Sequence, residues 1–195
     1  MKKLLFFLAL SFLITLSINA QGNSAGNNDI NLGDKNLIVY YSWSGNSKTI
    51  ANEIHSILNC DIVEILPTTP YTTDYNAMLN IAQREISAID TSGTYPAIRN
   101  NLENIGDYDT IFFCYPLWWS RMATPAQSFL FKHKDKLKGK KIALVCTSGS
   151  SGISQTVADA RRICLNSIFT EALHIRSANV ANARNLLTRW IGAIK

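Results

Sequence analysis

Three short segments hold the side chains with which this chain of 195 residues could bind a ligand. The first segment, Ser42-Trp43-Ser44-Gly45-Asn46-Ser47, places hydroxyl and amide groups around a glycine. If it opens a helix, unpaired N–H groups and a partial positive charge would join these donors, and the segment would suit a phosphate group. It contains neither GxxxxGK[ST] nor GxGxxG. An ordinary capped turn is the alternative interpretation.

The second segment is Tyr115-Pro116-Leu117-Trp118-Trp119-Ser120. Each indole has a large apolar area, so two consecutive tryptophans in a loop are costly to leave in water. One interpretation is that Trp118 and Trp119 form a wall for a flat aromatic ligand. The other is that they pack beneath the adjacent helix.

The third segment, Thr147-Ser148-Gly149-Ser150-Ser151-Gly152, is small and polar. Its backbone could approach a ligand closely, or the segment could be a flexible connection. A loop suited to phosphate, an aromatic loop and a small polar loop together indicate a ligand site more specifically than any one of them does alone. If one edge of one sheet holds all three, they describe a site for a mononucleotide with a planar ring.

Alternating strands and helices predict such an edge. Apolar, β-prone runs predict strands at 37–41, 61–66, 110–115 and 141–146 and a shorter strand within 168–175, and Pro116 is expected to end the third. Helical spacing predicts helices at 46–59, 75–89, 124–134, 153–165 and 180–194, and residues 67–73 and 90–107 are expected to be irregular. Buried parallel strands with helices on both faces follow from this order. Ligands bind at the carboxyl ends of such strands, where the three segments would meet.

The chain resembles the flavodoxin family at these positions. Ile38-Val39-Tyr40, Ser42, Gly45, Ala51 and Ile54 stand at the spacing of the flavodoxin FMN-phosphate signature, and Ser47 stands where that signature has Thr. Four further stretches look like a bacterial flavodoxin-like subgroup: Tyr115–Trp119, Cys146–Gly152, Pro70-Tyr71 and Asp74-Tyr75. The resemblance covers about residues 37–194.

The resemblance implies an α/β fold, a flavodoxin-like three-layer sandwich with a five-stranded parallel sheet in the order 2-1-3-4-5. It also implies FMN as the cofactor, with phosphate on residues 42–47 and ring contacts from 116–119 and 147–152. The expected binding residues are Ser42, Trp43, Ser44, Gly45, Asn46, Ser47, Pro116, Leu117, Trp118, Trp119, Thr147, Ser148, Gly149 and Gly152.

The first twenty residues read as an export signal. Met1-Lys2-Lys3 is a basic start, residues 4–18 are mostly apolar, and Ala20 precedes the expected cleavage before Gln21. A membrane helix is the alternative, but 15 residues are fewer than the roughly 20 that a span needs. We therefore expect an exported protein, periplasmic or secreted, without stable membrane insertion after cleavage. Residues 21–36 read as a flexible leader and residues 37–195 as the FMN-binding domain.

Charge separates this chain from most electron-transfer flavodoxins, which the resemblance implies are strongly acidic and cytoplasmic. The formal charge is +5, and removal of Lys2 and Lys3 lowers it to +3. The segment 132–141 contains six lysines and one aspartate. It is either a solvated helix end or a docking patch for an acidic redox partner. No aromatic residues alternate with these lysines, so nucleic-acid binding is not predicted.

The remaining reactive residue types predict no catalytic or metal site. The spacing of Cys60, Cys114, Cys146 and Cys164 matches no zinc motif, and their apolar neighbours favour free thiols over the disulfides that export would permit. The three histidines are scattered along the chain, so neither a metal nor a His-based triad is expected.

Three functions follow as hypotheses. The first is an FMN protein that transfers electrons to or from a redox partner, in which the flavin performs the chemistry. The second is an FMN-dependent NAD(P)H:quinone-type reductase, with room for a substrate beneath residues 67–107. The third is a non-redox binding protein for a phosphorylated ligand.

Overall fold

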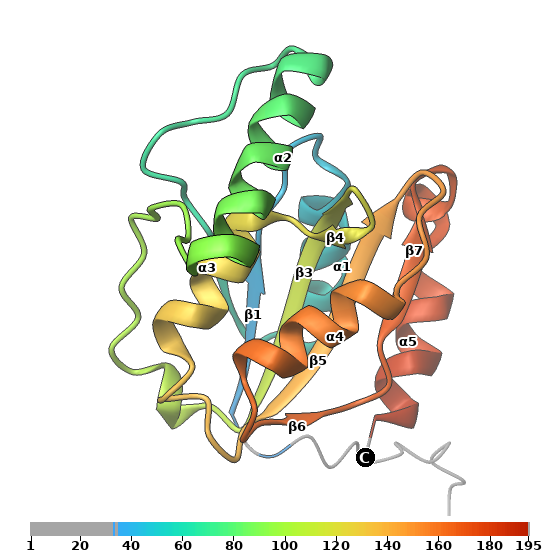
Figure 1. Ribbon diagram of the computed structural model, residues 1–195. Coiled ribbons are helices and arrows are strands. Elements are labelled where there is room, and N and C mark those ends of the chain that lie inside the picture. The colour runs from blue at the N-terminus through green and yellow to red at the C-terminus, as the bar shows by residue number, and fades with distance from the viewer. Residues whose placement is uncertain (1–32, 34, 195) are drawn as a thin grey trace, which may run out of the picture.

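A parallel sheet between two layers of helices forms the centre of the computed structural model, which describes residue 33 and residues 35–194 (Figure 1). The strands lie in the order β2-β1-β3-β5, and β6 and β7 both pair with β5. Their bounds are β1 Asn36–Tyr40, β2 Asp61–Glu64, β3 Thr110–Trp118, β5 Lys141–Ser148, β6 Ile168–Phe169 and β7 Leu173–Arg176. The expected order 2-1-3-4-5 is confirmed. β5 is the fourth strand, and β6 and β7, which both lie beside β5, together take the place of the fifth.

Helices cover both faces of the sheet. Helices α1 (Asn46–Leu58) and α5 (Arg184–Ala193) lie behind it in Figure 1, and α3 (Thr124–His133) and α4 (Ser154–Ile163) lie in front. Helix α2 (Tyr75–Ser92) lies near the carboxyl ends of the strands and packs on α3. Two short 3-10 helices are also present, η1 (Ile105–Asp107) and η2 (Ser177–Asn182).

Each strand buries side chains on both faces. Paired Ile38, Phe112 and Ala143 belong to the core beneath α1 and α5. Their neighbours Val39, Phe113 and Leu144 belong to the core beneath α3 and α4. Because successive side chains of a strand point to opposite faces, an uninterrupted apolar run is what a two-sided sheet requires.

Pro116 does not end the third strand, and the prediction that β3 stops at 115 is wrong. β3 continues to Trp118, and Pro116 pairs with Thr147 of β5. The carbonyl of Pro116 accepts from the Ala123 N–H on the side where β1 has already ended, so the missing proline N–H removes no hydrogen bond to β1 or β5. Beyond it, Arg121–Met122 turns back as β4, antiparallel to β3.

Other boundaries moved by a few residues. The expected fifth strand is broken into β6 and β7, and the expected last helix is split into η2 and α5. The segment expected to be irregular contributes the last turn of α2, which ends at Gly93 (φ 65°). Asp74 caps α2, since its carboxylate accepts from the Ala77 N–H at 2.7 Å.

All four cysteines are free thiols, as expected. Cys114 and Cys146 lie in neighbouring strands but belong to the cores on opposite faces of the sheet, so they cannot join. Among the described residues, no helix is long and apolar enough to cross a membrane. The expected signal segment 1–20 and nearly all of the expected leader lie outside the described residues.

Candidate functional site

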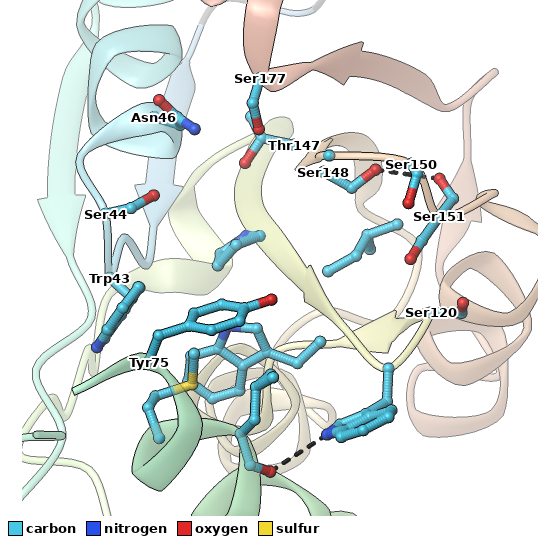
Figure 2. A pocket seen from close by; sticks show the side chains of 17 residues that line it. Trp43, Ser44, Asn46, Tyr75, Ser120, Thr147, Ser148, Ser150, Ser151 and Ser177 are labelled. Atoms are coloured by element: carbon cyan, nitrogen blue, oxygen red, sulfur yellow. Dashed lines mark hydrogen bonds between the residues drawn. The ribbon is translucent and has the colours of Figure 1, made fainter. Parts of the chain in front are cut away.

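A pocket of about 580 Å³ lies at the carboxyl ends of β1, β3 and β5 (Figure 2). This volume falls within the range of about 300–1,000 Å³ that small-molecule and cofactor sites occupy. All three sequence segments reach it, because parallel strands bring their carboxyl ends to one edge. The lining residues are Trp43, Ser44, Asn46, Tyr75, Met78, Leu79, Pro116, Leu117, Trp118, Trp119, Ser120, Thr147, Ser148, Gly149, Ser150, Ser151 and Ser177.

The β1–α1 loop presents polar groups at the N-terminus of a 13-residue helix. Gly45 precedes α1 with φ 92°, a left-handed conformation that favours glycine. The Gly45 N–H donates to the Ser42 hydroxyl at 3.1 Å, so these two residues shape the loop without lining the pocket. Ser44 and Asn46 line it, next to helix N–H groups that have no partner in the preceding turn. The loop therefore suits an anion.

Ser47 lies behind this loop rather than on the pocket surface. Its side chain is 1% exposed, and its hydroxyl lies 2.9 Å from the Thr147 hydroxyl of β5. Thr147 itself lines the pocket. The Ser47 hydroxyl can therefore act on a ligand only through Thr147. Its backbone N–H, at the second position of α1, could contact a ligand directly.

The two consecutive tryptophans have different environments. The Trp118 ring is 4% exposed and packs edge-on against Tyr41 and Tyr71, with ring centroids 5.5 Å and 5.1 Å away. Trp119 is 53% exposed, and its Nε1–H donates to the Leu79 carbonyl of α2 at 3.2 Å. Trp118 is therefore mainly a core residue that also touches the pocket, while Trp119 offers most of its ring at the mouth.

Helix α2 supplies a wall that reasoning from the sequence missed. Tyr75, Met78 and Leu79 line the pocket, and the Tyr75 ring lies 6.0 Å from that of Trp43. The Trp43 Nε1–H donates to the Thr72 carbonyl at 2.9 Å, which holds this indole beside α2. In Figure 2, Trp43 and Tyr75 lie on one side of the pocket, apart from the hydroxyls of Thr147 and Ser177. The sequence signals for this wall were the predicted helix 75–89 and the Asp74-Tyr75 stretch that carries part of the family resemblance.

Serine hydroxyls and backbone of the loop after β5 form the third part of the lining. The Ser148 hydroxyl donates to the Ser151 carbonyl at 3.0 Å and lies 2.8 Å from Nε2 of His174. Since a hydroxyl carries a single proton, Nε2 of His174 is the donor in the second bond. Gly152 lies beyond the lining. No pattern along the chain indicated that His174 would support this loop or that Ser177 would line the pocket.

The lining is uncharged. None of the described residues that line it carries a carboxylate, ammonium, guanidinium or imidazole group. In the part of the chain described, no three acidic, His or Cys residues gather where they could hold a metal ion. The site can bind and orient a ligand through neutral donors and aromatic rings, and its side chains offer no acid or base for proton transfer at neutral pH.

The lysine-rich segment 132–141 lies far from this pocket. Lys141 begins β5 and Ser148 ends it, a separation of about 23 Å at about 3.3 Å per residue. Several of these lysines have partners within the protein: Lys132 donates to the Asn100 carbonyl, Lys136 pairs with Glu103 and Lys138 with Asp135. The segment is therefore a lysine-rich helix end with several partners inside the protein, at a distance from the pocket.

A doubly wound sheet with a polar helix N-terminus and an aromatic wall at its carboxyl edge defines a flavodoxin-like protein. Residues 35–194 match the family model described as flavodoxin, and the chain belongs to this family. No curated protein sequence matches it.

Solved structures have the same fold. A flavoprotein from Lactobacillus acidophilus NCFM in complex with FMN is 23% identical with a TM-score of 0.63, covering 81% of this chain and 99% of its own. A protein from Bacteroides eggerthii DSM 20697, provisionally assigned as a flavoprotein, is 26% identical with a TM-score of 0.62, covering 79% and 98%. A similarly assigned protein from Bacteroides uniformis ATCC 8492 is 22% identical with a TM-score of 0.66, covering 80% and 99%.

Proposed function

We propose that the protein binds FMN in this pocket and transfers electrons to or from a redox partner. The observation that carries the proposal is an uncharged pocket with two chemically distinct parts, a helix N-terminus with hydroxyls and a set of aromatic rings. A phosphate and a planar ring need these two environments. Membership of the flavodoxin family and the FMN complex of the Lactobacillus acidophilus flavoprotein support the same cofactor.

The residues present fit FMN. Ser44, Asn46 and the first N–H groups of α1 would hold the phosphate through neutral donors, as helix N-termini do for anions. Trp43, Tyr75 and Trp119 would contact the ring. Bound FMN supplies the electron-transfer chemistry, and the protein supplies binding, orientation and exclusion of water.

Electron transfer is favoured over substrate turnover by the absence of ionisable side chains other than Tyr75 among the described lining residues. Turnover with NAD(P)H and a quinone includes proton transfers, which a positioned acid or base accelerates. A redox partner would meet the exposed rings of Tyr75 and Trp119 at the pocket mouth, 59% and 53% accessible, rather than the lysine-rich segment.

One experiment on the purified protein separates the three hypotheses. We expect a yellow protein that binds FMN more tightly than riboflavin, is reduced slowly by NAD(P)H alone and is reduced rapidly when a flavin reductase is added. Sustained NAD(P)H turnover that saturates with both reductant and quinone would establish the reductase instead. If the protein has no affinity for flavin, the remaining hypothesis is a non-redox binding protein for a phosphorylated ligand.

We further propose that the protein works outside the cytoplasm after cleavage before Gln21. The basic start, apolar run and small residue at position 20 support this proposal. N-terminal sequencing of the protein recovered from the periplasm or medium should begin at Gln21. Recovery of a chain that keeps Met1 in the cytoplasm would contradict export.

A further inference from the structure

The hairpin between β3 and β4 has an unusual backbone beside the pocket. Its two turn residues, Trp119 (φ 52°) and Ser120 (φ 61°), are both left-handed and both line the pocket. Two-residue turns of this kind favour Asn-Gly, because L side chains are disfavoured at positive φ. Such a backbone persists where the surrounding structure fixes it, and it gathers at ligand sites.

Arg121, the next residue, supplies contacts that fix it. Its Nη1 and Nη2 donate to the two carboxylate oxygens of Asp90 at 2.9 Å and 3.0 Å, and its Nε donates to Asp159 at 2.6 Å. These three residues are called the Arg121 network. A planar guanidinium that uses all three of its nitrogens in this way is held in one orientation.

The network joins three elements around the pocket. Asp90 belongs to α2, Asp159 to α4, and Arg121 to β4, where it lies directly opposite Trp118 of β3. Asp159 is 1% exposed, and its Oδ1 also lies 3.7 Å from Nη2 of Arg162. Burial and this second partner hold the Asp159 carboxylate in place. The guanidinium in turn lowers the pKa of the Asp90 carboxyl, which keeps that residue charged.

Two walls of the pocket depend on this junction. Helix α2 carries Tyr75, Met78 and Leu79, and the hairpin carries Trp119 and Ser120. They touch at the pocket through the bond from Trp119 to the Leu79 carbonyl, and the Arg121–Asp90 pair ties them again further along α2. Among the described residues, breaking the pair would leave the Trp119–Leu79 bond as the hydrogen bond between the two walls, beside the packing of α2 on α3.

We propose that Arg121 is a positioning residue for the cofactor, which fixes α2 and the left-handed hairpin at the separation that the planar ring requires. This inference rests on the proposed function, since it concerns the same pocket. Arg121 is absent from the pocket lining and acts through Trp119 and α2.

The decisive variant is Asp90→Asn, which removes one carboxylate of the network and keeps the Arg121–Asp159 bond. Asp90 has a 44% exposed side chain, so the fold should tolerate this change. Arg121→Met and Arg121→Lys test the other partner, with Lys retaining charge but not the planar fork. The matched control is Arg184→Met, which breaks an ion pair with Glu53, also 2.9 Å long, between α5 and α1 and outside the pocket.

We expect Asp90→Asn to weaken FMN binding roughly three- to tenfold, the effect of residues that modulate a site without touching its ligand. Arg121→Met should weaken FMN binding more than Asp90→Asn does. The FMN affinity of Arg121→Lys should lie between those of the wild type and Arg121→Met. The visible circular dichroism of bound FMN should change, and amide hydrogens of residues 117–122 should exchange faster in the apoprotein. Arg184→Met should leave all three readouts unchanged.

Asp90→Asn protein that melts like wild type and keeps the wild-type FMN affinity, dichroism and exchange rates would overturn the role of Arg121. Unchanged binding in variants of a wild type that binds FMN contradicts this inference alone. A wild type that binds no FMN would overturn the proposed function together with it.

Discussion

The Ser47 hydroxyl lies 2.9 Å from the Thr147 hydroxyl, although the two residues are 100 positions apart. The bond joins the first turn of α1 to the end of β5, and Ser47 is 1% and Thr147 2% exposed. Two of the three loops that reach the pocket are thus connected beneath it. The bond helps to fix the position of one loop relative to the other.

Because the two hydroxyls share this bond, removing each in turn should show which of them contributes to FMN binding and which to stability. Thr147→Val removes a hydroxyl from the pocket lining while keeping the shape of the side chain, and Ser47→Ala breaks the same bond from behind. If Thr147 donates to the FMN phosphate, its loss costs about 1.5–3 kcal/mol, or tenfold or more in Kd. We expect Ser47→Ala to weaken binding less and to lower stability by about 0.5–1.5 kcal/mol.

Fluorescence titration with FMN and with riboflavin measures this difference. Riboflavin lacks the phosphate, so Thr147→Val should leave its weaker binding nearly unchanged. Equal losses for the two flavins would remove Thr147 from the phosphate site.

Replacement of Trp118 should mainly lower stability, whereas replacement of Trp119 should mainly weaken FMN binding. Trp118→Ala removes a buried ring between Tyr41 and Tyr71 and should lower the free energy of unfolding by about 3–5 kcal/mol. Trp119→Ala removes a mostly exposed ring and should leave stability nearly unchanged while weakening FMN binding roughly tenfold, given about 1–3 kcal/mol for stacking on a base. Urea unfolding and FMN titration of both variants check this. Unaltered FMN affinity in Trp119→Ala would exclude that ring from the site.

Acid should destabilise the fold through His133. This imidazole is 2% exposed, Nδ1 lies 2.8 Å from the Phe129 carbonyl, and Nε2 accepts the Leu102 N–H at 3.1 Å, so the ring is neutral. Burial is the main cause that lowers its pKa, and the same cause lowers the pKa of His174. The unfolded chain therefore binds protons more tightly, and stability should fall as pH drops below about 6.5, by at most ~1.4 kcal/mol per pH unit for each histidine.

Unfolding free energies of wild type and His133→Gln between pH 7.5 and 5.5 test this prediction. The variant should be less stable at pH 7.5 and lose less stability on acidification. His55→Gln, at a half-buried histidine, serves as the control. Parallel pH profiles for wild type and His133→Gln would contradict the assignment.

The thiols should resist modification in the native protein. Burial raises the pKa of Cys60 to about 11 and those of Cys146 and Cys164 to about 12, and Cys114 is fully buried and also raised. Since the thiolate is the nucleophile, a disulfide reagent at pH 7 should react slowly with native protein, at half-buried Cys60 first. In denaturant all four thiols should react. Fewer than four thiols after denaturation would reveal a disulfide or oxidised cysteine.

The amino-acid sequence was informative where local pattern and topology agree. Uninterrupted apolar runs such as 37–41 are typical of strands covered on both faces, and parallel strands share one carboxyl edge. That reasoning assigned Ser44, Trp118 and Thr147 to one ligand site, and all three line the pocket. Pro116 misled it, because a proline ends a strand where its missing N–H would remove a bond to a neighbouring strand of the sheet, and β1 has already ended at this position.

Pattern along the chain was sufficient to predict the sheet, its strand order through the family resemblance, and the three loops at its edge. Packing in three dimensions determines which side chains face the pocket. Trp118 and Trp119 are the same residue type in consecutive positions, and a left-handed turn buries one and exposes the other. The α2 wall and the Arg121 network likewise depend on how α2 packs across the strand ends. Local pattern indicates which element a segment forms, whereas contacts between distant segments depend on packing that spacing along the chain does not encode.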